Sequence, residues 1–162
     1  MLSYFAGYAG AALSVKTWAW QLAHPHEPLP GVQTFTQGRG YYLNEEELLN
    51  QINEDVATGE KISGRKPTVM VLGALGRCGT GACDLFTKAG LPEKNITRWD
   101  LNETKDRHGP YEEIVQHDIF LNAVGIVADE SDEGANKTYR SIFRSQSRLL
   151  SIMIFWPGLA VY

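Results

Sequence analysis

The stretch from Lys66 to Asp100 restricts the fold of this 162-residue chain more than any other part of it. It begins with an apolar run around Val69 and Val71, which is typical of a strand buried on both faces. Three glycines follow at a spacing of three: Gly73, Gly76 and Gly79. An amphipathic helical segment and a short strand from Ile96 come next, and Asp100 lies 21 residues beyond the last glycine. This order predicts a dinucleotide-binding unit.

Each part of this unit has an expected role. Gly73 permits the tight turn after the strand, Gly76 lets a pyrophosphate approach the backbone, and Gly79 lets the helix pack closely on the sheet. The beginning of the helix offers N–H groups to phosphates, and Asp100 is placed to accept hydrogen bonds from a ribose diol. Its carboxylate favours NAD over NADP, because it would repel a 2′-phosphate. A turn whose glycines serve packing alone is the alternative.

Composition narrows the class of protein. The length fits one domain, alone or with an appendage, and a net charge of −4 gives no reason to expect nucleic acid or an anionic membrane as a partner. The two cysteines, Cys78 and Cys83, form no CxxC pair and no cluster at zinc spacing, so we expect no metal site and a reducing, cytoplasmic location. For Cys78, a small residue filling a tight turn is favoured over a thiol with a lowered pKa.

Two helices are expected before the glycine unit. Small and aromatic residues at helical spacing predict the first over residues 4–23, where glycines at 7 and 10 would allow close packing. A proline-broken connector follows. Asn44 is a good N-cap for the second helix, with Glu47 completing a capping-box pattern, and Gly59 with the polar residues after it is expected to end that helix. Its apolar stripe is Leu48, Leu49, Ile52 and Val56.

A polar loop and a third strand are expected after Asp100. Thr104 lies close enough in the sequence to share a ribose or adenine contact, and a turn-capping threonine is an equal alternative. His108 is given no role. A short helical segment at residues 112–117 precedes a strong strand at residues 118–126, which should run parallel to the first.

These elements together predict an α/β fold: a partial Rossmann-like parallel sheet with flanking helices, an N-terminal helix and an irregular C-terminal tail. We divide the chain into an N-terminal helix and connector (1–31), an insertion with a helix (32–64), an NAD-binding core (65–126) and a divergent tail (127–162). The apolar residues 149–162 are too few to span a bilayer, so no membrane partner is expected.

Residues 4–22 and 65–125 closely resemble the fungal, NAD-dependent, L-lysine-forming saccharopine dehydrogenases. The clusters GALGRCGTGA, WDLNET and DIFLNA carry this resemblance. It implies a central fragment of an enzyme of lysine biosynthesis through α-aminoadipate. That enzyme oxidises the secondary amine of saccharopine with NAD, and hydrolysis of the imine gives L-lysine and 2-oxoglutarate.

The resemblance also implies roles for single residues. Gly76 and Arg77 would contact the pyrophosphate of NAD, while Asp100 and Thr104 would bind the adenosine ribose region. The family's lysine and histidine acid–base residues fall in a domain that would precede Met1, so no catalytic residue is expected here. The chain departs from the family at Ala123, where the family has a cysteine, at Gly125, where it has an aromatic residue, and in an inserted segment, Thr36–Tyr42.

Three functions remain open from the sequence. The first is the NAD-binding part of saccharopine dehydrogenase, inactive alone and acting on saccharopine or lysine only if the missing domain is supplied. The second is a non-catalytic nucleotide-binding or interaction fragment from a truncated gene model. The third is an S-adenosylmethionine methyltransferase, which shares the glycine turn and the acid, although the family clusters argue against it.

Overall fold

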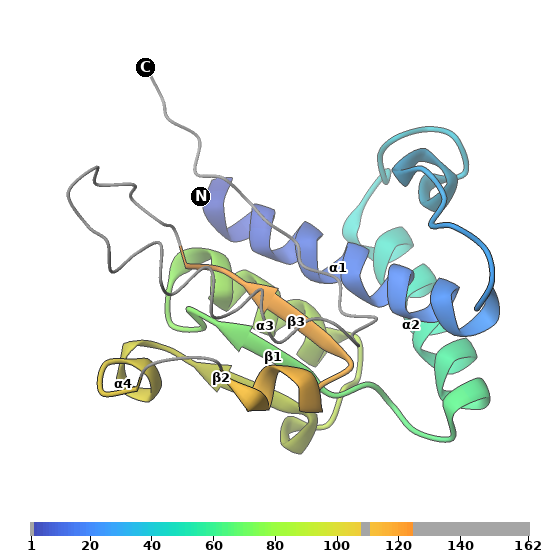
Figure 1. Cartoon of the computed structure of the whole chain (residues 1–162). Helices are drawn as coiled ribbons and strands as arrows, with labels where there is room; N and C mark the ends of the chain where they lie inside the picture. The colour runs from blue at the N-terminus through green and yellow to red at the C-terminus, as the bar shows by residue number, and fades with distance from the viewer. Residues whose placement is uncertain (1, 108–110, 125–162) are drawn as a thin grey trace.

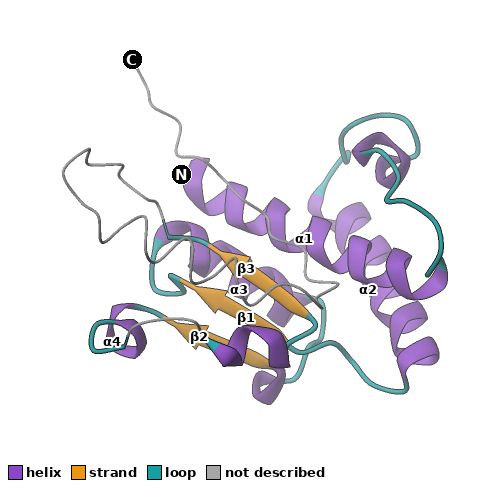
Figure 2. Cartoon of the chain, viewed as in Figure 1, coloured by secondary structure: helices purple, strands orange, loops and turns teal. Residues whose placement is uncertain are grey.

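The computed structural model describes residues 2–107 and 111–124. Figure 1 shows these elements, and Figure 2 distinguishes helix from strand. In chain order they are α1 (Leu2–Ala23), η1 (Val32–Thr36), α2 (Glu45–Ser63), β1 (Val69–Leu72), α3 (Arg77–Lys88), η2 (Glu93–Asn95), β2 (Ile96–Trp99), α4 (Leu101–Thr104), η3 (Glu112–Gln116) and β3 (Ile119–Asn122), where η marks a 3₁₀-helix.

The three strands form one parallel sheet in the order β2-β1-β3. Val69, the first residue of β1, pairs with Ile96 on one side and with Ile119 on the other. All four residues of β1 are buried, as expected for a central strand with both faces covered. The predicted partial Rossmann-like α/β fold is confirmed.

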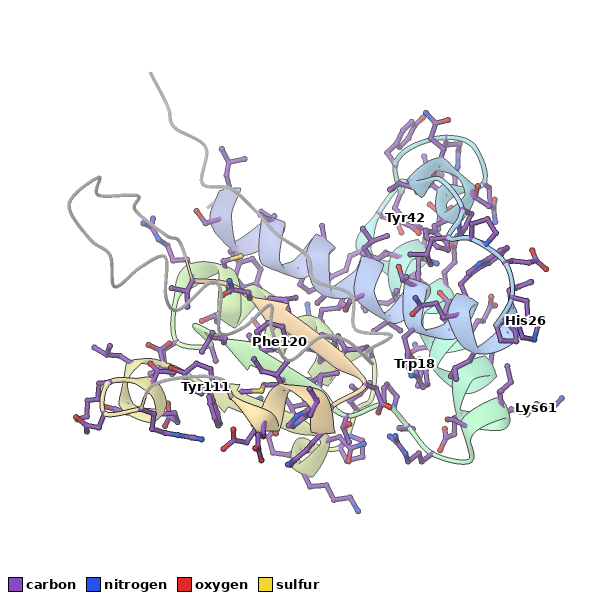
Figure 3. All side chains as sticks on the ribbon, viewed as in Figure 1. Trp18, His26, Tyr42, Lys61, Tyr111 and Phe120 are labelled. Carbon is purple, nitrogen blue, oxygen red and sulfur yellow. The ribbon has the colours of Figure 1, made fainter. Side chains whose placement is uncertain are left out.

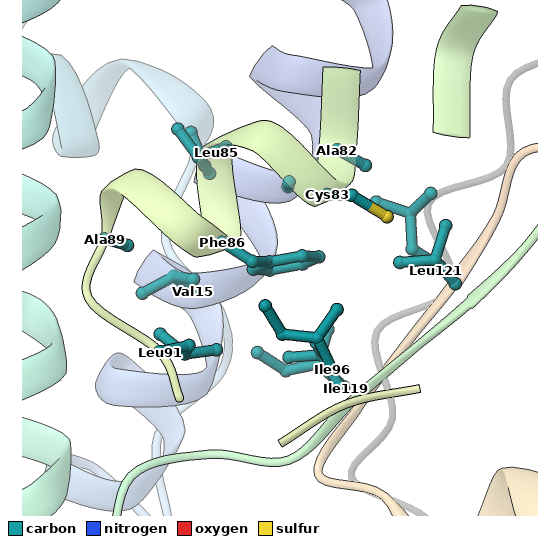
Figure 4. Packing of buried hydrophobic residues seen from close by; sticks show 14 of the residues in the cluster. Val15, Ala82, Cys83, Leu85, Phe86, Ala89, Leu91, Ile96, Ile119 and Leu121 are labelled. Atoms are coloured by element: carbon teal, nitrogen blue, oxygen red, sulfur yellow. The ribbon is translucent and has the colours of Figure 1, made fainter. Parts of the chain in front are cut away.

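The larger core lies on the face of the sheet that α3 covers. α1 packs along α3 and also contacts β3, and α2 packs against α1. Phe86 of α3 is fully buried at the centre of this layer, where Figure 4 shows it surrounded by side chains of α1 and of the sheet, among them Val15, Ile96 and Ile119. The predicted α2 stripe is confirmed, since Ile52 and Val56 are buried in this core and the two leucines before them pack against it.

A smaller core covers the opposite face of the sheet. Met70, Leu72 and Phe120 point to this side, where Tyr111 and Ile114 of the η3 segment bury them. Figure 3 labels Tyr111 and Phe120 on this side of the sheet. The expected short helical segment before β3 is therefore present, as a 3₁₀-helix.

The ends of α2 differ in part from the prediction. Asn44 is the N-cap, and its side chain accepts a hydrogen bond from the Glu47 N–H at 2.8 Å. The Glu47 carboxylate, however, accepts from the N–H of Leu43, one residue before the cap, at 2.8 Å. The helix ends within the polar residues after Gly59, as predicted, but not at Gly59 itself. α2 continues to Ser63 and ends at Gly64, whose φ of 79° suits glycine.

Gly59 instead serves a close contact between two helices. A Cβ at this position would lie 2.1 Å from the ring of Trp18 in α1, so only glycine lets α2 approach that indole. Gly7 confirms the close packing expected of α1, because a Cβ there would lie 1.8 Å from the carbonyl oxygen of Cys78.

His108, Gly125 and the tail of residues 127–162 lie outside the described residues. Among the described helices, none combines the length and the apolar character needed to cross a membrane.

One carboxylate joins the beginnings of β1 and β3. Asp118 accepts two hydrogen bonds from the Arg65 guanidinium, at 2.5 and 2.8 Å. It also accepts from the N–H and the hydroxyl of Thr68, at 2.8 and 2.9 Å. Burial alone would raise the pKa of Asp118, but these donors outweigh it and hold the pKa below its ordinary value.

We expect Asp118→Asn to lower the free energy of unfolding by about 2 kcal/mol at pH 7, because the hydrogen bonds to a charged acceptor are lost. A carboxyl whose pKa is lowered by folding contributes stability above its unfolded pKa of about 4, and that contribution disappears as the pH falls through the folded pKa. The variant should therefore lose less stability than the wild type on acidification below about pH 4.

Urea unfolding between pH 2 and pH 7 measures both effects. Asp106→Asn, which changes an exposed carboxylate, is the control and should behave like the wild type. Parallel pH profiles for Asp118→Asn and the wild type would contradict the prediction.

Candidate functional site

The predicted site residues gather at one edge of the sheet. The three strands run in the same direction, and Figure 1 shows their carboxyl ends at the edge where the turn into α3 and the short α4 lie. This edge is where open α/β sheets bind ligands. The turn connects the end of β1 to α3, and Asp100 connects the end of β2 to α4.

The glycine turn is fastened to the end of β2 by successive N–H groups. The carbonyl oxygen of Trp99 accepts from the N–H of Gly73 at 2.7 Å and from the N–H of Ala74 at 3.0 Å. The next N–H, that of Leu75, donates to the Asp100 carboxylate at 2.9 Å. We call these three bonds the turn clasp. Gly73 has a φ of 82°, a left-handed conformation that glycine adopts without strain, and this turns the chain toward β2.

The other two glycines differ in what surrounds them. A Cβ at Gly79 would lie 2.1 Å from the Gly73 carbonyl oxygen, so a side chain there would push α3 away from the turn. A Cβ at Gly76 would meet only that same oxygen, at 3.3 Å, and Gly76 is exposed. Gly79 therefore serves close packing, as expected, while the backbone of Gly76 is open to the outside.

The beginning of α3 has the features of an anion site. Gly76 is its N-cap and supplies no side-chain cap, and the first backbone bond of the helix joins the Thr80 N–H to the Gly76 carbonyl at 2.8 Å. The N–H groups of residues 77–79 precede that bond and lie at the positive end of the helix dipole. Arg77, the first residue of α3, is exposed beside them.

Asp100 lies between the turn and α4 and is held as an anion. One of its oxygens accepts from the Leu101 N–H at 2.8 Å and the other from the Leu75 N–H. These two bonds lower the pKa of Asp100. Glu103 closes a capping box by accepting the Asp100 N–H at 2.7 Å.

Sequence reasoning missed the contacts of Asp100 with Glu103 and with the Leu75 N–H. The spacing Asp100-x-x-Glu103 is a capping-box pattern and was a usable signal for Glu103. No sequence pattern pointed to the Leu75 N–H.

Thr104 and Arg98 are engaged within the chain. The Thr104 hydroxyl donates to the carbonyl oxygen of Asp100 at 3.1 Å, and the carbonyl oxygen of Leu101 lies 3.4 Å from it, so the hydroxyl bonds back within α4. Such bonds within the chain are the kind expected if Thr104 stabilises a turn, and they also place the hydroxyl next to Asp100. The Arg98 guanidinium pairs with Glu93, which precedes β2.

The two cysteines are not activated as nucleophiles. Burial raises the pKa of the Cys78 thiol although it lies in the first turn of α3, and burial likewise raises the pKa of Cys83. The raised pKa of Cys78 is opposite to the lowered pKa that was the alternative, and the residue is half-buried within α3. Among the described residues no group of histidine, cysteine or acidic side chains is placed to hold a metal ion.

The end of β3 completes this edge of the sheet. A Cβ at Gly73 would lie 2.9 Å from a methyl group of Val124 and 3.1 Å from the backbone of Ala123. Ala123 is thus next to the glycine turn. Two cavities of about 390 and 410 Å³ lie elsewhere, between α1 and the segment of residues 32–48.

The chain is similar to saccharopine dehydrogenases described as NAD(+)-dependent and L-lysine-forming. It is 51% identical to that of Yarrowia lipolytica over 122 residues, 48% identical to that of Emericella nidulans over 123 residues, and 45% identical to that of Schizosaccharomyces pombe over 122 residues. Each match covers 75% of this chain and 31% of the relative. No family model matches the chain. The resemblance to saccharopine dehydrogenase is confirmed, and the chain spans about a third of the length of these relatives.

Because Gly76 is exposed and Gly79 is buried, we expect the two glycines to respond differently to an added methyl group. Gly79→Ala should lower the free energy of unfolding by about 1–3 kcal/mol, because its Cβ overlaps the Gly73 carbonyl and overpacks the helix against the turn. Gly76→Ala should change stability by less than about 1 kcal/mol, since only one atom must move slightly. Urea unfolding of both variants measures the difference, and equal stabilities would contradict the packing role of Gly79.

Proposed function

We propose that this chain is the NAD-binding part of a saccharopine dehydrogenase. The observation that carries the proposal is the turn clasp, which sets the uncapped beginning of α3 next to a carboxylate held in its ionised form. These groups fit NAD, because N–H groups at a helix N-terminus suit a pyrophosphate and an ionised acid suits a ribose diol. The names of the relatives support the same cofactor.

Each predicted residue has a place in this proposal. The open backbone at Gly76 and the N–H groups after it would hold the pyrophosphate, and Arg77 would add a charge-assisted hydrogen bond. Gly73 and Gly79 shape the turn that presents these groups. Asp100 would accept from the ribose hydroxyls, with Thr104 beside it. Leu75 and Leu101, exposed by 76% and 69%, flank Asp100 and offer apolar surface to the adenine ring.

The charges at this edge favour NAD over NADP. Asp100 is ionised at neutral pH, so a 2′-phosphate beside it would be repelled. The one nearby arginine of β2, Arg98, is paired with Glu93, and this pairing supports the same preference.

The reaction of the whole relative is a further part of the proposal. NAD would accept the hydride from the secondary amine of saccharopine, and the residues described here would bind and orient the cofactor for that step. The acid–base residues that the resemblance implies belong to a part of the family that this sequence does not match. We therefore propose that the 162 residues bind NAD and do not oxidise saccharopine by themselves.

Calorimetric titration tests the cofactor site. The wild type should bind NAD more tightly than NADP, and Asp100→Ala should weaken NAD binding by about tenfold or more, because hydrogen bonds to a charged group are lost. Removing the carboxylate also removes its repulsion of the 2′-phosphate. The ratio of the two dissociation constants should therefore approach one in the variant.

The ratio of the NADP and NAD dissociation constants shows whether Asp100 contacts the ribose directly or only holds the turn in place. Asp106→Ala, which removes a carboxylate from the same polar loop, should keep both affinities of the wild type. If Asp100→Ala weakens NAD and NADP equally, Asp100 acts only through the turn clasp. If the wild type binds no NAD, the proposal falls, and tight binding of S-adenosylmethionine in its place would favour a methyltransferase.

The activity of the purified chain is a separate test. With saccharopine and NAD at saturating concentrations, absorbance at the wavelength of NADH should not rise above that of a sample without protein. Adding a protein segment that carries the remaining two thirds of a relative should restore NADH formation only if the two pieces associate. NADH formation by the 162 residues alone would contradict the proposed division of labour.

A further inference from the structure

α1 rests directly on the first turns of α3 through two glycines. A Cβ at Gly7 of α1 would lie 1.8 Å from the carbonyl oxygen of Cys78, the second residue of α3. A Cβ at Gly81 of α3 would in turn lie 2.1 Å from the carbonyl oxygen of Tyr4 in α1. The two backbones therefore touch without side chains between them, and α1 passes over α3 at this point (Figure 1).

α2 holds α1 in place on another face, so α1 cannot easily move away from α3. Its buried Lys16 donates to Asp55 and Gln51 of α2, at 2.9 and 3.1 Å. Trp18 of α1 fills the space that a side chain at Gly59 of α2 would need. Because packed interiors transmit displacement instead of absorbing it, an added atom at Gly7 would move the beginning of α3.

The part of α3 that would move is the part that faces the proposed phosphate site. Cys78, whose carbonyl oxygen touches Gly7, belongs to the same turn as the N–H groups that precede the first helical bond. Those N–H groups must lie within hydrogen-bond distance of phosphate oxygens, and such bonds weaken steeply with distance and angle. Asp100, by contrast, is held by the turn clasp and by Glu103.

We propose that Gly7 is a positioning residue for the proposed NAD site, setting through α3 where the pyrophosphate-binding N–H groups lie. This inference rests on the proposed function and adds to it a residue 66 positions before the first glycine of the turn. A Cβ at Gly7 would meet the backbone of Cys78 at the beginning of α3, so the effect of a substitution should be confined to the pyrophosphate.

The experiment compares two ligands on the full chain. ADP-ribose carries the pyrophosphate, whereas adenosine carries only the ribose and base that Asp100 would hold. Gly7→Ala should raise the dissociation constant for ADP-ribose by about tenfold and change that for adenosine by less than twofold, since each lost tenfold corresponds to one good hydrogen bond. Ligand-observed NMR measures the dissociation constant for adenosine, which binds weakly.

Gly31→Ala is the matched control. A Cβ at Gly31 meets nothing within 4 Å, and its φ of −61° accepts alanine, so both affinities should equal those of the wild type. Gly81→Ala, on the opposite side of the same contact, should reproduce the selective loss of ADP-ribose binding. Circular dichroism establishes that each variant is folded at the temperature of the titration.

If Gly7→Ala does not fold, Tyr4→Phe provides the test. It removes the hydroxyl that donates to Asp84 of α3 at 2.6 Å and leaves the packing in place. It should still raise the ADP-ribose constant by a measurable amount, about twofold, with adenosine unchanged. Equal losses for the two ligands, or no loss in any of these variants, would overturn the positioning role. A wild type that binds neither ligand would instead overturn the proposed function and this inference with it.

Discussion

The carbonyl oxygen of Trp99 is the acceptor on which the arrangement of this edge of the sheet depends. It holds the N–H groups of Gly73 and Ala74, and the adjacent Asp100 holds the next one along the chain. The turn that would carry the pyrophosphate and the acid that would carry the ribose are thus fixed to each other directly. A movement of either one displaces the other, so their spacing is set by two consecutive residues at the end of β2 and not by the sheet as a whole.

Much of the fold could be predicted because its signals are local. The apolar run of β1 and the N-cap at Asn44 each lie within a few residues, and both predictions were confirmed. The role of Gly59 in α2 could not be predicted, for the opposite reason. Gly59 is retained inside a helix because of Trp18, which lies 41 residues earlier, and nothing near Gly59 in the sequence reveals that contact.

In the candidate site, too, the contacts between residues that are separated in the sequence could not be predicted. The glycine roles followed from spacing, because a tight turn and close helix packing have few other solutions. The bond from the Leu75 N–H to Asp100 could not be predicted, since it requires the left-handed conformation of Gly73 to aim a backbone group across to the next strand. The pairing of Arg98 with Glu93 likewise follows from no motif in the sequence.

The hydrogen bonds from Arg65 and Thr68 to Asp118 join segments that are far apart in the sequence, and this affects the order in which the chain can fold. β1 is the central strand, yet both of its neighbours come later in the sequence, and Asp118 lies 50 residues after the Thr68 that it binds. α1, α2 and β1 are therefore synthesised before β2 and β3, the two strands that pair with β1 in the described sheet. β2 closes the shorter loop with β1 and should pair with it first. α1 contacts β3, so part of its apolar surface stays exposed until β3 has been synthesised and has paired with β1. A ribosome-bound chain that stops before residue 118 would hold α1 and α2 without the layer that completes their core.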